Sequence, residues 1–103
     1  MAKREIIWSL HALKNLDDLH NYLIQFSVQG AENVLNEILE STKRLIKDPE
    51  FGRPEPIFKE SGFPHRYLRQ RHFKIIYHID KGRIYIDRIF SMYQHPSRLK
   101  KGK

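Results

Sequence analysis

The chain has 103 residues, no cysteine, 40% hydrophobic and 30% charged residues, and a formal net charge of +7. This length suits one domain over residues 1–103, and the composition excludes both a disordered chain and a disulfide or thiolate-metal framework. No apolar run approaches the ~20 residues of a membrane span and no signal-peptide pattern follows Met1–Glu5, so we expect a soluble cytoplasmic protein without a membrane partner.

The first quarter of the chain predicts a short strand followed by a helix. Glu5–Trp8 is apolar and β-rich, which is typical of a strand. Ser9 stands where a helix N-cap belongs. After it, apolar residues recur at spacings of three and four, which predicts one apolar stripe of a helix: Leu13, Leu16, Leu19, Leu23 and Phe26.

A second helix follows a short interruption. Ser27–Gly30 breaks the periodic pattern, and Gly30 is the expected turn residue. The next stripe consists of Ala31, Val34, Leu35, Ile38, Leu39, Thr42, Leu45 and Ile46. Asp48–Pro49 ends it, because a residue before proline is disfavoured in the helical region. Two helices joined by so short a turn should form an antiparallel hairpin.

Three strands are expected after an irregular connection. Residues 51–65 are rich in proline and glycine, and Tyr67–Arg71 is a plausible strand. In the next strand Phe73, Ile75, Tyr77 and Ile79 should face opposite to His72, Lys74, Ile76 and His78. Asp80–Arg83 should form a tight turn with Gly82 at positive φ. The return strand alternates Ile84, Ile86, Arg88 and Phe90 against Tyr85, Asp87, Ile89 and Ser91.

The predicted fold class is therefore α+β. An N-terminal strand and an antiparallel two-helix hairpin precede a three-stranded antiparallel meander that completes a small sheet, covered on one face by the helices. We expect Trp8 and the two helix stripes to be buried. One core should contain Leu16, Leu23, Leu35, Ile38, Ile75, Tyr77 and Ile86.

Charge is distributed unevenly along the chain. Residues 62–103 contain eleven Lys and Arg against Asp80 and Asp87, which gives +9 and leaves −2 for residues 1–61. Such a split indicates a surface that meets a polyanion. RNA, DNA and an acidic protein partner all remain open at this point.

Several segments in this order resemble the RelE/ParE toxin superfamily of bacterial type II toxin–antitoxin systems. Ile6-Ile7-Trp8-Ser9-x-x-Ala12 is similar to the first strand and helix entry of that family, and Asp48 to Pro54 to its segment after the helices. Arg66-Tyr67-Leu68 and Phe73 to Ile79 resemble its middle strands. Gln94 to Lys100 resembles the tail of ParE-like members.

The resemblance implies the toxin half of a toxin–antitoxin pair, with roles in growth inhibition and plasmid stabilisation. We favour the ParE-like branch, which implies inhibition of DNA gyrase, because Ser91-Met92-Tyr93 lacks the arginine that RelE-like members carry near the end of the last strand. The alternative is a RelE-like ribosome-dependent mRNA endonuclease. A third interpretation is an inactive toxin-like binding module.

Candidate site residues follow from both the charge pattern and the resemblance. In a RelE-like enzyme Lys74 would stabilise the charge of the reacting phosphate, and Tyr93 or His95 would act as general acid or base. Each also has an ordinary interpretation, as an outward strand residue or a residue at a strand end. Nucleic-acid or antitoxin binding is assigned to Arg66, Tyr67, Arg69, Arg71, Lys74 and Arg98, since arginine beside aromatic residues suits both kinds of partner.

The expected partners follow from the same resemblance. They are a cognate antitoxin with an acidic or amphipathic segment, and either DNA gyrase or the ribosome with its mRNA as target. A dimer or a heterotetramer with antitoxin is also implied. No cofactor is expected. None of the six histidines forms an i, i+4 pair around an acid, so no metal site is predicted.

Overall fold

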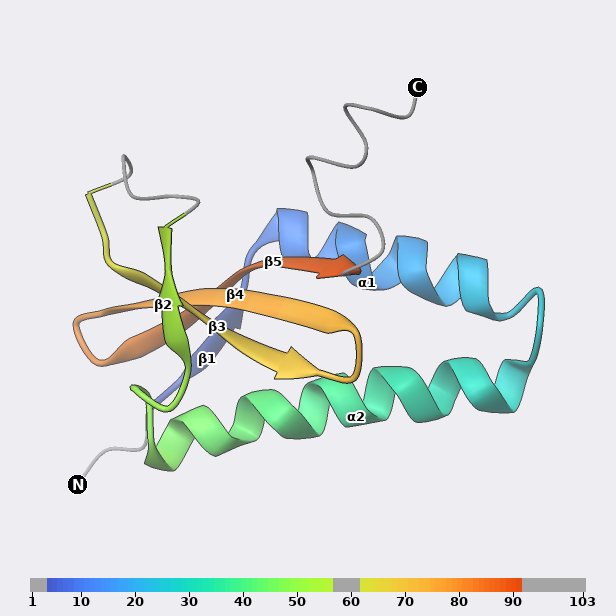
Figure 1. Ribbon diagram of the computed structural model, residues 1–103, viewed down its shortest axis with the longest axis horizontal. Coiled ribbons are helices and arrows are strands. Elements are labelled where there is room, and N and C mark those ends of the chain that lie inside the picture. The colour runs from blue at the N-terminus through green and yellow to red at the C-terminus, as the bar shows by residue number, and fades with distance from the viewer. Residues whose placement is uncertain (1–3, 57–61, 92–103) are drawn as a thin grey trace.

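A computed structural model describes residues 4–56 and 62–91 of the chain (Figure 1). Within these ranges neither helix is long and apolar enough to cross a membrane. The elements in chain order are β1 (Ile6–Trp8), α1 (Leu10–Leu23), α2 (Val28–Lys47), β2 (Arg53–Glu55), β3 (His65–Gln70), β4 (Phe73–Asp80) and β5 (Arg83–Ser91).

The described strands form one five-stranded sheet in the order β1-β5-β4-β3-β2. β1 pairs parallel with β5, and the other neighbouring pairs are antiparallel. The helix hairpin provides the long connection that a parallel pair requires, because it lies between β1 and the later strands in the chain. This arrangement confirms the predicted α+β class with its N-terminal strand, helix hairpin and antiparallel meander.

β2 was not predicted, because Pro54 lies in its centre. The expectation of an irregular connection over residues 51–65 is therefore wrong for Arg53–Glu55 and for His65. A strand with proline is tolerated at a sheet edge, where the missing N–H breaks no ladder on the outer side. β2 occupies such an edge and, among the described strands, pairs only with β3 (Figure 1).

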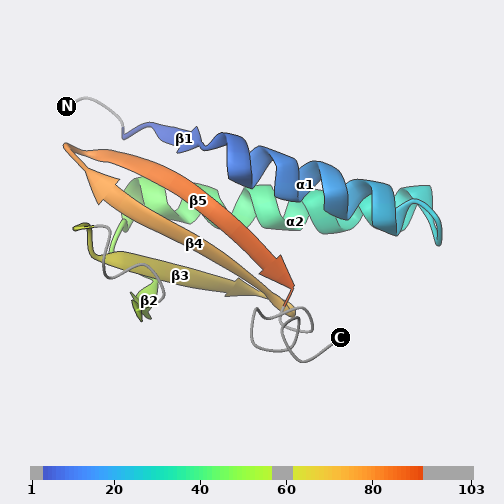
Figure 2. The same cartoon turned by 90° about the horizontal axis from the view of Figure 1, so that it is seen from above.

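Two serine side chains start the helices. The Ser9 hydroxyl accepts a hydrogen bond from the amide of Ala12 at 3.0 Å, as the sequence predicted. The Ser27 hydroxyl accepts from the amide of Gly30 at 2.8 Å, so α2 already begins at Val28. The expectation that Gly30 forms the turn is wrong, because this cap draws it into the first helical turn. The two helices lie antiparallel, joined at one end (Figure 2).

The core lies between the helix hairpin and one face of the sheet. It contains Ala12, Ile38, Leu45, Leu68, Phe73, Ile75, Tyr77, Ile84, Ile86 and Ile89, with Leu16 and Trp8 packed against it. Part of each predicted stripe instead faces solvent: Leu13 is 47% exposed, Phe26 71% and Leu39 37%. The α1–α2 connection extends beyond the strands that would cover it, which leaves its apolar residues uncovered (Figure 2).

A β-bulge in β5 changes which residues face the core. Tyr77 pairs with Ile86 while Ile76 pairs with Arg88, so Asp87 is the extra residue. Ile89 therefore joins Ile84 and Ile86 in the core. The expectation that Arg88 and Phe90 share the face of Ile84 and Ile86 is wrong, because one inserted residue exchanges the two faces beyond it.

The turns that flank β4 differ in how well the sequence indicates them. Lys81 and Gly82 both have positive φ, 53° and 79°, which confirms the predicted tight turn. Arg71 was predicted within a strand, yet it has a φ of 57° and forms the β3–β4 turn with His72. That prediction is wrong because β3 ends at Gln70, which pairs with Phe73 and leaves a two-residue loop.

Candidate functional site on the open face of the sheet

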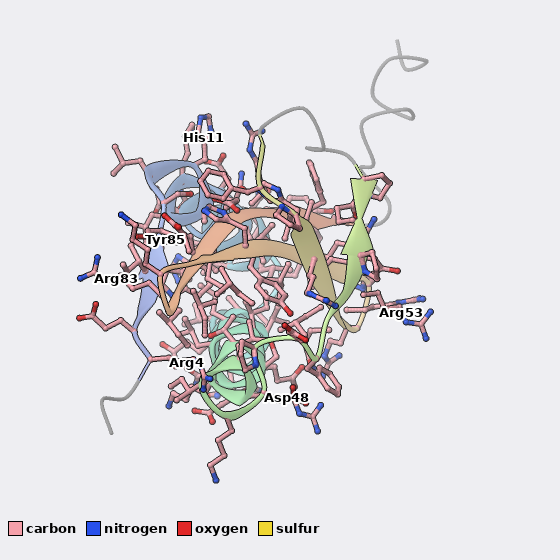
Figure 3. The ribbon with its side chains drawn as sticks, turned by 90° about the vertical axis from the view of Figure 1, so that its left-hand side faces the viewer. Arg4, His11, Asp48, Arg53, Arg83 and Tyr85 are labelled. Carbon is pink, nitrogen blue, oxygen red and sulfur yellow. The ribbon has the colours of Figure 1, made fainter. Side chains whose placement is uncertain are left out.

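The sheet face turned away from the helices carries the candidate functional residues, and we call it the open face. Strand register places His65, Tyr67 and Arg69 of β3 on it, opposite His78, Ile76 and Lys74 of β4. β2 adds Arg53 and Glu55, and β5 adds Tyr85, Asp87, Arg88 and Phe90. Arg53 extends outward from β2 (Figure 3), and strand register places Tyr85 on the same face of the sheet.

Lys74 lies at the centre of the open face, as alternation predicted, but its charge is compensated. Its Nζ lies 2.5 Å from Oε1 of Glu55 and 4.3 Å from the centroid of the Tyr67 ring. The Lys74 side chain is 17% exposed and that of Glu55 is 5% exposed. Lys74 is thus one half of a largely buried ion pair beneath an aromatic ring, where removal of one partner leaves an uncompensated charge.

Arg66 does not lie on the open face. Its guanidinium donates hydrogen bonds to the carbonyl oxygens of Glu50 at 3.3 Å and Gly52 at 2.8 Å. It therefore ties β3 to the segment that follows α2. These backbone partners give Arg66 a structural role.

Arg71 also has a partner on the helix side. Its Nη2 donates to Oε2 of Glu37 on α2 at 2.8 Å, and its Nε contacts Oε1 of the same carboxylate. The hydrogen bond from Arg71 lowers the pKa of Glu37, and the same bond raises the pKa of Arg71. This exposed bidentate pair links the β3–β4 turn to the helix hairpin.

The positive charge of residues 62–103 is therefore divided among several surfaces. Within the described ranges, Arg66 and Arg71 contact the helix side, and Arg83 pairs with Glu5 at the β1–β5 edge at 3.0 Å. The described cationic residues of the open face are Arg53, Arg69, Lys74 and Arg88. Glu55 and Asp87 oppose them.

Two of these cations were not among the predicted site residues. Arg53 falls in the segment expected to be irregular, and Arg88 was assigned to the opposite face because alternation does not foresee the bulge. No sequence pattern signals Glu55 as the partner of Lys74, since the two are brought together only through β3. Tyr93, His95 and Arg98 lie outside the described residues.

Two histidines and one aspartate meet at the other end of the open face. Asp87 Oδ2 lies 2.6 Å from Nδ1 of His78 and 3.1 Å from Nε2 of His65. The ring of Tyr85 stacks on that of His78, with 5.0 Å between centroids and 10° between planes. The three polar residues come from three different strands, so spacing along the chain could not bring them together as a group.

A helix hairpin on one face of a small mixed sheet, with cations and aromatic rings on the other, is the arrangement expected for the RelE/ParE superfamily. The family model described as "ParE toxin of type II toxin-antitoxin system, parDE" matches residues 6–96. The chain therefore belongs to the ParE toxin family of type II toxin–antitoxin systems.

One solved structure supports the fold independently. A chain of the chromosomal ParDE toxin–antitoxin system from P. aeruginosa superimposes with a TM-score of 0.70, over 86% of this chain and 96% of that chain. The two sequences are 21% identical, so this likeness concerns the fold. No curated protein sequence matches the chain.

Proposed function

We propose that this toxin inhibits bacterial growth by acting on DNA gyrase, and that a cognate antitoxin neutralises it in the cytoplasm. Membership of the ParE family over residues 6–96 supports the gyrase target over the ribosome. The observation that carries the choice of mechanism is the Lys74–Glu55 ion pair.

An endonuclease of this fold would need an available cation on the central strands. Charge stabilisation at a reacting phosphate depends on positive groups aimed at the developing charge. The ammonium group of Lys74 is already paired with the carboxylate of Glu55 at 2.5 Å, and the ring of Tyr67 packs against the same group. A phosphate that approached Lys74 would be repelled by the largely buried carboxylate of Glu55 unless it displaced that carboxylate.

The same face offers a docking surface for an antitoxin segment. Arg53 and Arg69 are exposed on neighbouring strands, and Tyr67 lies between them. Exposed guanidinium groups beside an aromatic ring suit an acidic or amphipathic segment, because arginine pairs with carboxylates in bidentate geometry and also packs on rings. We infer that the antitoxin binds here and that a toxin–antitoxin assembly forms.

The test combines an assay of the purified chain with one in cells. We expect the purified chain to inhibit supercoiling by purified gyrase. In cells, expression without antitoxin should damage DNA while ribosome-bound mRNA stays intact. Codon-phased mRNA ends after induction, with gyrase unaffected, would contradict the proposal and favour the endonuclease. Inactivity in both assays by folded protein would instead favour a binding module.

The variants must separate lost chemistry from lost stability. Lys74→Ala leaves Glu55 as a buried uncompensated charge, which typically costs about 3–5 kcal/mol. A matched Lys74→Met/Glu55→Gln double variant removes both charges together and should fold better. If gyrase inhibition does not involve Lys74, the double variant still inhibits gyrase. An endonuclease would lose cleavage in both variants.

A further inference from the structure

We propose that His65, His78 and Asp87 form a binding site for a divalent metal ion of the zinc class. The three ligand atoms, one from each residue, all lie within 4.8 Å of one another. Two imidazole nitrogens and one carboxylate oxygen are a common zinc ligand set, and three protein ligands leave a fourth position for water.

Strand pairing holds the three residues in place. His65 on β3 is directly opposite His78 on β4, and His78 is opposite Tyr85 on β5. Asp87 is the extra residue of the β5 bulge, and its carboxylate reaches both histidines. Bulges often redirect one side chain in this way. The ligands thus lie on three adjacent strands of a rigid sheet.

The hydrogen bond of His65 defines which of its nitrogens faces the cluster. Nδ1 lies 3.0 Å from the carbonyl oxygen of Phe63, and a carbonyl oxygen only accepts, so Nδ1 carries the hydrogen. The other ring nitrogen, Nε2, therefore faces the cluster and lies 3.1 Å from a carboxylate oxygen of Asp87. A backbone carbonyl that orients an imidazole in this manner is the usual outer partner of a metal-binding histidine.

The three side chains differ in their exposure to solvent. The side chain of His65 is 5% exposed, whereas those of His78 and Asp87 are 15% and 23% exposed. Aromatic rings wall the site, since Phe63 and Tyr85 both pack on His78, with ring centroids 4.8 Å and 5.0 Å away. An apolar shell of this kind excludes solvent and favours the metal–ligand bonds.

A metal would require a small rearrangement of the cluster. Ligands bonded at 2.0–2.1 Å in tetrahedral geometry are separated by about 3.3 Å. The present separations at Asp87 Oδ2 are 2.6 Å and 3.1 Å, so each must widen by less than about 1 Å. The two histidine ligand atoms lie within 4.8 Å of each other, so their separation has to change by no more than about 1.5 Å.

The experiment uses the untagged 103-residue chain after treatment with a chelator. We expect Zn²⁺ to bind with one-to-one stoichiometry in calorimetry and to raise the melting temperature as its free concentration increases. Co²⁺ should give the visible absorption of a four-coordinate site. The ¹⁵N shifts of the His65 and His78 rings should change on addition of Zn²⁺, and those of His11 and His72 should not.

Variants provide the matched comparison. His78→Gln and Asp87→Asn should weaken Zn²⁺ by more than the roughly 10- to 100-fold that loss of an outer partner costs. His72→Gln removes a histidine outside the cluster and should bind as the parent does. Absence of saturable binding, or equal affinity in His78→Gln and His72→Gln, would overturn the proposal. Because the ¹⁵N readout uses the unaltered chain, a variant that fails to fold does not remove the test.

Discussion

The hydroxyl group of Tyr77 ties β4 to the segment between α2 and β2. Its Oη donates a hydrogen bond to the carbonyl oxygen of Pro49 at 2.7 Å and accepts one from the amide of Gly52 at 2.9 Å. A Cβ on Gly52 would lie 2.6 Å from this hydroxyl and 2.7 Å from the carbonyl oxygen of Tyr67. Glycine at position 52 is therefore needed for close approach, and the segment after α2 is fixed against β4.

Tyr77→Phe should lower the free energy of unfolding by about 1–3 kcal/mol, because it leaves the buried amide of Gly52 without its acceptor. The effect depends on pH. Burial raises the pKa of Tyr77 above its ordinary 10.0, so the folded chain keeps this proton after the unfolded chain has lost it. The stability from this group is complete below pH 10 and declines above it.

Urea unfolding of both proteins between pH 7 and 11 measures this difference. The gap between parent and Tyr77→Phe should narrow as the pH rises past about 10. Tyr22→Phe is the control, since Tyr22 is 56% exposed and its loss should change little. A gap that stays constant across this range would mean that Tyr77 titrates alike in the folded and unfolded chains.

At the scale of secondary structure, the bulge in β5 determines what both faces of the sheet present. It places Ile89 in the core and Arg88 on the open face, where Asp87 contacts His65 and His78. Asn15 of α1 supports this part of the strand, because its side-chain oxygen accepts a hydrogen bond from the amide of Ile89 at 2.9 Å. Without the bulge, Arg88 would face the core and Ile89 the open face.

Ile89→Ala tests the register directly. Ile89 is 7% exposed within the core, so truncation should cost about 2–5 kcal/mol. Arg88→Ala, one position earlier on the open face, should cost clearly less. Strict alternation predicts the reverse order, and chemical denaturation of the two variants distinguishes the registers. A larger loss for Arg88→Ala would contradict the bulged pairing.

The periodicity of apolar residues and the turn residues were sufficient to predict the helices and the hairpin turn. They were not sufficient to predict the helix cap at Ser27 or the bulge in β5. The spacing of apolar residues predicted both helices, and Asp80–Arg83 predicted the hairpin turn, because these signals are local. The Ser27 cap moved the start of α2, and one bulge exchanged the faces beyond Asp87. Lys74 was correctly placed on the open face, whereas its pairing with Glu55 depends on two strand pairings that the sequence does not display.

For the whole molecule, the internal partners of the basic residues matter more than the net charge of +7. Lys74, Arg71 and Arg83 are each paired with a carboxylate, so little of their charge is available to a partner. Arg53 and Arg69 are exposed on the open face. The association rate of a partner that is attracted electrostatically should therefore depend more strongly on these two arginines than on the net charge of the chain.

Arg69→Gln should consequently slow association with the cognate antitoxin several-fold at low salt and reduce the dependence of that rate on ionic strength, because steering by exposed charges is screened by salt. Lys47→Gln removes the same charge from the end of α2, away from the open face, and should leave the rate close to that of the parent. Stopped-flow or surface-based kinetics at two salt concentrations provide the measurement, with the antitoxin taken from the adjacent reading frame.

Equal effects of the two substitutions would mean that net charge alone drives the encounter. An unchanged rate in both would place the antitoxin on another surface, of which the exposed apolar residues of the helix hairpin, such as Leu10 and Phe26, would be the next to test.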